Sequence, residues 1–158
     1  MVQGSIKIRR KYWKERGNIK MRIAVTGSRY LTNKHFNKVK IEGTDGKYIG
    51  RTLTDILSGI LHDLFEDGDQ LIFIEGGANG ADKICKEWCK SNGVLHEEYP
   101  AHWDIGKSAG PLRNQEMAER CDYCLAFPII GLKNKGTMDM IKRCESLGKH
   151  VDVYWMEI

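Results

Sequence analysis

Three turns of the chain combine glycine with small or polar residues at the end of a strand-like segment or shortly after it. They are residues 26–29 (TGSR), 75–82 (EGGANGAD) and 135–139 (KGTMD). Glycine lets backbone amides approach a ligand closely, and a helix amino terminus offers unpaired N–H groups and partial positive charge. One such turn would only indicate a tight strand-to-helix connection, but three together favour a site for a phosphorylated ligand.

A fourth stretch, residues 109–117 (AGPLRNQEM), is polar where a helix is expected to begin. Pro111 favours a helix start because the N–H that proline lacks has no intrahelical partner there. Arg113 follows in the same turn, and Arg29 follows the first glycine turn. A guanidinium can donate two parallel hydrogen bonds to a phosphate, so we expect both arginines to bind one.

Two common nucleotide-binding motifs are absent from the sequence. Residues 106–108 (GKS) resemble the end of a P-loop, but Ala101 stands where the first glycine is required. The glycines at positions 76–80 also lack the G-x-G-x-x-G spacing of a dinucleotide fingerprint. We therefore expect neither a P-loop kinase nor a standard NAD oxidoreductase, and we expect no cofactor.

Short apolar runs alternate with segments of helical periodicity along the rest of the chain. Strands are predicted at 22–26, 71–74, 94–98, 123–127 and 151–155, and helices at 53–65, 81–91, 111–120 and 137–146. This alternation predicts an α/β fold, a single Rossmann-like domain whose mostly parallel sheet has helices on both faces. Ligands bind such sheets beyond the carboxyl ends of the strands, where the glycine turns lie.

Two segments fall outside this alternation. Residues 30–50 are polar and rich in glycine, which predicts an inserted loop or lid, or a hairpin. Residues 1–20 carry seven Lys or Arg and a single acid, Glu15, and we interpret them as a basic N-terminal extension of a domain spanning 21–158.

The distribution of charge argues against a nucleic-acid partner. The chain of 158 residues has a net charge of +4, of which residues 1–20 hold +6, so the domain itself carries −2. No apolar run is long enough to span a membrane, and no apolar segment of a secretory signal follows the basic start. We expect a cytoplasmic protein without membrane contact.

Five cysteines, with no sign of a secretory signal, indicate reduced thiols. Cys85, Cys89, Cys121 and Cys124 have spacings that would also suit a four-cysteine zinc site. Cys85 lies on an apolar helical stripe and Cys124 opens a strand, so we favour buried core thiols and expect no metal.

Four segments together resemble a known family. The segments MRIAVTGSR, EGGANGAD, YPAHWDIGKSAGPLRNQEM and LAFPIIGLKNKGTMDM occur in the order seen in the YspA-like, cpYpsA-related branch of the SLOG superfamily. That superfamily includes the DNA-processing protein DprA and the LOG (Lonely Guy) phosphoribohydrolases. The resemblance covers about residues 21–155 and implies a Rossmann-like domain that binds a nucleotide or nucleotide-derived ligand, as a sensor or a sink, with homo-oligomers common among relatives.

The resemblance also implies roles for individual residues. Asp82 would close the second turn, Arg113 would bind phosphate, and Asn114 would bond a sugar or base edge. Alternatively, Arg113 and Asn114 would brace the loop carrying Trp103, which we interpret as a packing anchor rather than a stacking platform. The residues implied to face the phosphate are Gly27, Ser28, Arg29, Gly76, Gly77, Gly136 and Thr137.

The chain departs from the LOG hydrolases at the third turn. Met140 stands where those enzymes carry a catalytic glutamate. Asp139 is one residue earlier, so on a helix it points in a direction about 100° away. Asp139 is instead expected to bond backbone amides of its own helix start. Binding is therefore the favoured function, and the alternative is hydrolysis of an N-glycosidic bond with Asp139, Asp82 or Glu75 as the acid–base group.

Overall fold

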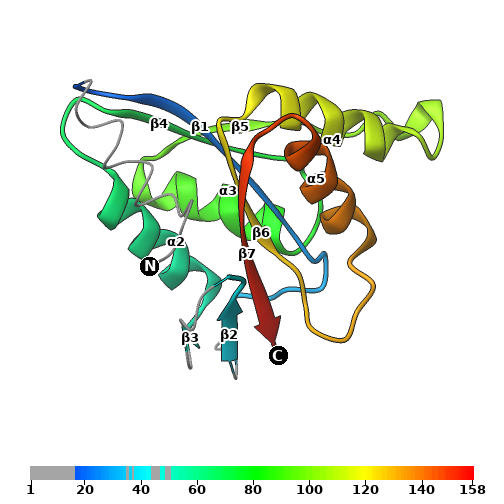
Figure 1. The fold of residues 1–158 in the computed structure, drawn as a ribbon, viewed down its shortest axis with the longest axis horizontal. Helices are drawn as coiled ribbons and strands as arrows, with labels where there is room; N and C mark the ends of the chain where they lie inside the picture. Colours follow the sequence, from blue (N-terminus) through cyan, green and yellow to red (C-terminus); the bar gives the residue numbers. More distant parts are fainter. Residues whose placement is uncertain (1–16, 35, 37, 44–46, 49–50) are drawn as a thin grey trace.

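The computed structural model describes residues 17–34, 36, 38–43, 47–48 and 51–158, and in them the chain folds around one seven-stranded sheet (Figure 1). The order of the strands across the sheet is β3-β2-β7-β6-β1-β4-β5. The strands are β1 (Lys20–Gly27), β2 (Lys38–Ile41), β3 (Lys47–Tyr48), β4 (Gln70–Glu75), β5 (Leu95–Glu98), β6 (Tyr123–Phe127) and β7 (His150–Glu157).

Strand β1 lies inside the sheet and pairs in parallel with β4 on one side and β6 on the other. After β1 the chain forms β2 and β3 at the far edge of the sheet, then builds outward from β1 through β4 to β5, and last crosses to build β6 and β7 on the opposite side of β1. The direction of winding reverses between β1 and β6, and parallel sheets bind ligands at the carboxyl edge of such a reversal. The predicted α/β architecture is confirmed.

In the described part of the chain, two helices cover each face of the sheet (Figure 1). The apolar sides of α2 (Leu53–Leu64) and α3 (Ala81–Asn92) pack with Ile23 and Val25 of β1 in one core cluster. On the other face α4 (Ala109–Arg120) and α5 (Lys135–Ser146) pack with Ala24. Alternate residues of β1 thus supply the two cores. Within the described part of the chain, every helix is too short or too polar to cross a membrane.

The predicted helix boundaries hold where a side chain or glycine fixes them. The Thr52 hydroxyl accepts a hydrogen bond from the Asp55 amide, and the Asp55 carboxylate accepts one from the Thr52 amide. These two bonds form a capping box at the start of α2. Gly93 ends α3 in the left-handed conformation. Helix α4 begins two residues before Pro111, whose missing N–H still falls within the first turn, where no intrahelical partner is needed.

The described parts of the 30–50 insert lie at one edge of the sheet. Strands β2 and β3 pair with each other in antiparallel fashion, and β2 continues the sheet by pairing antiparallel with β7. Val39 of β2 is fully buried in the larger core cluster. The rest of the insert, and residues 1–16 of the predicted extension, lie outside the described residues.

The last residues of the predicted extension that are described belong to the folded sheet. Strand β1 begins at Lys20, and Ile19 packs against the core. The Ile19 amide donates to Asp69 Oδ1 at 3.0 Å, and its carbonyl accepts the Gln70 amide at 2.8 Å. The extension therefore enters the sheet before position 21.

The cysteines divide between the two faces of the sheet. Cys85 and Cys89 lie in the core beneath α3, whereas Cys121, Cys124 and Cys144 lie in the core beneath α4 and α5. The four-cysteine set considered for zinc is therefore separated by the sheet, and that alternative is wrong. The hydrogen bond with Cys89, together with burial, raises the pKa of Cys85 well above its usual range, as expected for a thiol inside a core.

A glycine pair tests how tightly the β1 turn packs on α3. A Cβ at Gly80 would lie 2.2 Å from the Ser28 carbonyl oxygen, and the residue has a φ of 79°. Gly93 has a φ of 63°, but a Cβ there would meet no atom within 4 Å. We expect Gly80→Ala to lower the free energy of unfolding by about 3 kcal/mol or more, and Gly93→Ala by only about 1–2 kcal/mol. Chemical denaturation measures both; equal losses would contradict the close contact.

Candidate functional site

The first glycine turn joins β1 to the neighbouring elements. Gly27 has no room for a side chain, because a Cβ there would lie 2.7 Å from Ala81 Cβ and 2.9 Å from the Phe127 carbonyl oxygen. The Ser28 amide donates to Phe127 at 3.1 Å, and the Ser28 carbonyl accepts the Ala81 amide at 3.2 Å. The Arg29 guanidinium lies over the Tyr30 ring, 5.8 Å from its centroid. This turn thus fixes α3 and β6 to β1, and the Ser28 amide is already bonded to the protein.

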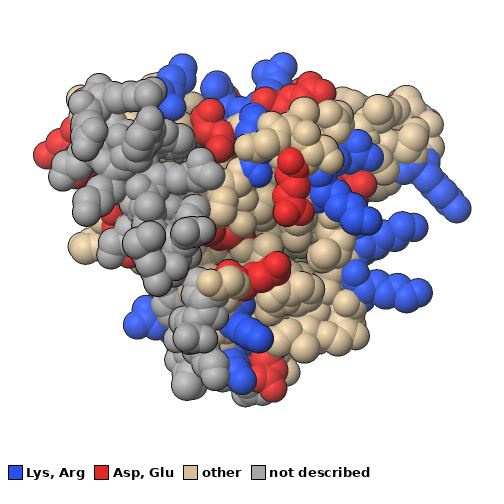
Figure 2. Space-filling view, viewed as in Figure 1, with Lys and Arg blue, Asp and Glu red and all other residues tan. Residues whose placement is uncertain are grey.

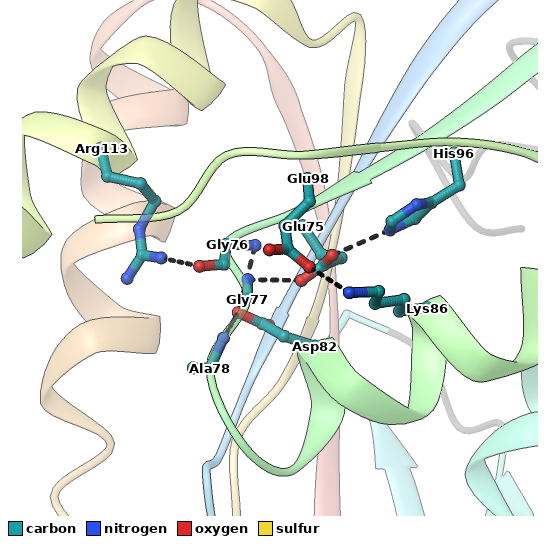
Figure 3. A network of polar contacts seen from close by, with 9 residues as sticks. All are labelled: Glu75, Gly76, Gly77, Ala78, Asp82, Lys86, His96, Glu98 and Arg113. Carbon is teal, nitrogen blue, oxygen red and sulfur yellow. Dashed lines mark hydrogen bonds and ion pairs between the residues drawn. The ribbon is translucent and has the colours of Figure 1, made fainter. Parts of the chain in front are cut away.

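The second turn has three consecutive backbone amides, and all three are bonded to carboxylates of the chain (Figure 3). Asp82 Oδ2 accepts from the amides of Gly76 and Ala78, each at 3.2 Å. Glu75 Oε2 accepts from Gly77. Asp82 therefore closes this turn as predicted. The interpretation of its amides as a phosphate cradle is corrected, because carboxylates occupy them.

Burial dominates the electrostatics beneath this turn. It raises the pKa of Glu75 to about 7, against the opposing hydrogen bond from Gly77. Burial, reinforced by the nearby Glu75 charge, also raises the pKa of Asp82 to about 7. His96 Nε2 lies 2.8 Å from Glu75 Oε1, and burial lowers the pKa of His96. Two carboxyls that titrate near neutrality thus lie under the backbone of the candidate site.

Arg113 connects the second turn to α4. Its Nη1 donates to the Gly76 carbonyl, and its Nε donates to Asn114 Oδ1 at 3.0 Å. A guanidinium has five N–H donors, so three of them have no protein partner among the described residues. The half-buried Arg113 side chain is therefore both fixed in place and able to bind an anion.

Asn114 continues this connection to α5. Its buried Nδ2 group contacts the Gly136 carbonyl at 3.3 Å and Asp139 Oδ2 at 3.0 Å. Asp139 Oδ2 also accepts from Arg143 Nε at 2.9 Å. Burial alone would raise the pKa of Asp139, but these hydrogen bonds outweigh it and the pKa is lowered. Asn114 thus braces α4 against α5, and its hydrogen bonds do not go to the loop carrying Trp103 that the alternative interpretation named.

The expectation that Asp139 bonds amides of its own helix start is wrong. Helix α5 begins at Lys135, two residues earlier than predicted, which places Asp139 in the second turn. There its carboxylate meets side chains of α4 and α5 instead. Met140 is fully buried in the core, so the position that carries the LOG glutamate faces away from solvent.

The amino terminus of α5, at the third predicted turn, is open to solvent at Lys135 and Gly136. Asn134 precedes it in the left-handed conformation, and its side chain folds back on residues 129–132 without capping the helix. Gly136 is exposed, with nothing within 4 Å of a Cβ position. Thr137 is buried, and its hydroxyl has no hydrogen-bond partner within the described part of the chain.

The structure corrects the role predicted for Trp103 and adds Glu98, which the sequence motifs missed. Trp103 is 63% exposed, although its ring lies beside Gly110, so its interpretation as a packing anchor is wrong. Glu98, the last residue of β5, lies against Gly77 and bonds Lys86, yet the motifs did not indicate it. The signal that could have found it is an acidic residue ending the strand after the glycine-rich turn and its helix.

Comparison with known proteins gives two matches. The YspA, cpYpsA-related SLOG family matches residues 21–106, which include the first two turns and end before α4. The Gene 61 protein of Mycobacterium phage D29 is 31% identical over 110 residues, which are 65% of this chain and 86% of that protein. No solved structure matches significantly.

The buried carboxyls predict an unusual dependence of stability on pH. The pKa values of Glu75 and Asp82 are about 7 in the folded state, above their ordinary values of 4.5 and 3.8. The folded state therefore holds more protons between about pH 4 and pH 7. Their stabilising contribution is fully present below about pH 4 and is lost as the pH rises through 7.

We expect the unfolding free energy of the wild type to fall between pH 5 and pH 8 by about 1–3 kcal/mol more than that of the double variant Glu75→Gln/Asp82→Asn. Denaturant titrations at each pH measure the difference. Glu116→Gln, which neutralises an exposed carboxylate on α4, is the control and should follow the wild type. Parallel curves for all three proteins would contradict the assignment.

Proposed function

Because this chain belongs to the YspA, cpYpsA-related SLOG family, we propose that it binds a nucleotide or nucleotide-derived ligand at the carboxyl edge of the sheet, as a sensor or a sink. The observation that carries this proposal is the open amino terminus of α5 beside β6, at the reversal of strand order. Arg113 belongs to the same hydrogen-bonded chain of residues, through Asn114.

The phosphate of the ligand would lie on the α5 side of the site. A helix amino terminus supplies N–H groups and partial positive charge, and the free donors of Arg113 add charge-assisted bonds. Lys133 and Lys135 flank this terminus and are exposed. Figure 2 shows Lys and Arg side chains projecting from the side of the molecule where α5 lies. The Thr137 hydroxyl is a further candidate donor.

A nucleoside phosphate hydrolase is the second candidate function, and Asp139 is the observation that favours it. Its carboxylate is one-third exposed, close to Gly136, and kept ionised by Arg143 and Asn114. Cleavage of an N-glycosidic bond needs negative charge beside the ribose as positive charge develops there. The burial of Met140 argues against the LOG arrangement, so binding is the favoured function.

Ligand identification comes first in testing the proposal. Mass spectrometry of small molecules released from purified, denatured protein should find a nucleotide or a nucleotide-derived compound. A thermal-shift panel of ribonucleoside mono- and diphosphates, NAD and ADP-ribose would extend the search. If no member of the panel raises the melting temperature and no such compound is released, the proposal fails.

Arg113→Ala should weaken binding of the best ligand in that panel by about 1.5–3 kcal/mol, the range for hydrogen bonds to charged groups. Arg120→Ala is the matched control, since Arg120 lies on the same helix in its last turn, over the Tyr99 ring. Calorimetry should show the control binding as the wild type does. An unchanged affinity for Arg113→Ala would remove this residue from the site.

Incubation with AMP should release no adenine at an enzymatic rate, because Asp139 is engaged by two side chains and Met140 is in the core. Chromatography of the free base measures this. Turnover near a typical roughly 10 per second, abolished by Asp139→Asn with binding intact, would make Asp139 catalytic and establish the hydrolase instead.

A further inference from the structure

Glu98 ends the second strand of a βαβ unit made by β4, α3 and β5. Glu75 and Glu98 are paired across β4 and β5 at the carboxyl edge, and Glu98 follows Gly77 by 21 residues. In βαβ nucleotide sites, an acidic residue about 20 residues after the glycine turn bonds a ribose hydroxyl. Glu98 occupies that place in the topology.

The Glu98 side chain lies directly over the second glycine turn (Figure 3). Its carboxyl carbon would be 3.2 Å from a Cβ on Gly77, which has a φ of 77°. Lys86 Nζ donates a hydrogen bond to Glu98 Oε1 at 2.8 Å, and this bond, with the charge of Lys86, lowers the pKa of Glu98 despite partial burial. A third of the side chain remains exposed. An ionised, oriented acceptor is therefore presented at this end of the site.

The surroundings of Glu98 disfavour a phosphate there. The amides of residues 76–78 are already bonded to Glu75 and Asp82. A phosphate above them would meet carboxylates in place of free N–H donors, and like charges repel at this range. A hydroxyl group, which donates a hydrogen bond and carries no charge, suits the same position.

We propose that Glu98 accepts hydrogen bonds from the ribose hydroxyls of the ligand, so that the site selects ribonucleotides over deoxyribonucleotides. This inference rests on the proposed function and gives the direction in which the ligand would lie in the site. The phosphate lies at the α5 terminus, the sugar hydroxyls lie over Gly77, and the Arg113–Asn114 pair connects the two ends.

The test compares ribonucleoside monophosphates with their 2′-deoxy and 3′-deoxy counterparts by calorimetry. The wild type should bind at least one ribonucleotide about tenfold or more tightly than one of its deoxy forms, because a bond to a charged acceptor is lost. Glu98→Gln should bring that ratio close to one. Glu97→Gln is the matched control, since the adjacent carboxylate pairs with Arg22, and it should keep the wild-type ratio.

The possible outcomes separate this inference from the function beneath it. If no nucleotide binds, the proposed function fails and the inference fails with it. If ribo and deoxy forms bind the wild type equally, or if Glu98→Gln keeps the preference, nucleotide binding stands and the role of Glu98 is overturned. The ratio of ribonucleotide to deoxyribonucleotide affinity is measured on the wild type alone. It therefore tests the inference even if the Glu98→Gln protein does not fold.

Discussion

The carboxyl edge of the sheet depends on how the amides of residues 76–78 are satisfied. A buried N–H without a partner costs about 1–3 kcal/mol, and the Gly76 amide is buried, whereas the amides of Gly77 and Ala78 are partly exposed. Glu75 and Asp82 supply the acceptors, but an unpaired buried carboxylate is itself costly. The structure resolves this conflict by raising both pKa values toward neutrality and placing His96 beside Glu75. A proton can thereby replace a full negative charge.

The same turn is connected by hydrogen bonds to α4 and α5 on the opposite face of the sheet. Its Gly76 carbonyl anchors Arg113, Arg113 bonds Asn114, and Asn114 bonds the backbone of Gly136 and the side chain of Asp139. Polar contacts thus join residues that are distant in the chain, in addition to the apolar packing of α4 and α5. The beginnings of α4 and α5 are held in mutual register at the place where a ligand would bind.

Local signals were enough to predict most of the fold. The apolar run at 123–127 gave a strand with the observed bounds, and the helices predicted at 53–65 and 81–91 are found within one residue of those bounds, next to the caps Thr52 and Gly93. The site was harder, since its contacts join β4 to α3, β5 and α4. Nothing in the spacing of Glu75 and Asp82 indicated that both would turn onto the same three amides. The earlier start of α5 was hidden because Asn134 enters it in the left-handed conformation.

The antiparallel strands β2 and β3 at one side of the sheet also affect the tendency of the protein to aggregate at high concentration. Without β2 and β3, the eight-residue strand β7 would expose a long row of backbone donors and acceptors, which invites pairing with another chain. Among the residues that the structure describes, the sheet ends instead in the two-residue β3 on that side and in the four-residue β5 on the other. The charged side chains of Glu97 and Glu98 at the end of β5, paired with Arg22 and Lys86, make that border unattractive to a second strand. Short and charged borders of this kind protect a sheet-containing protein from edge-to-edge aggregation.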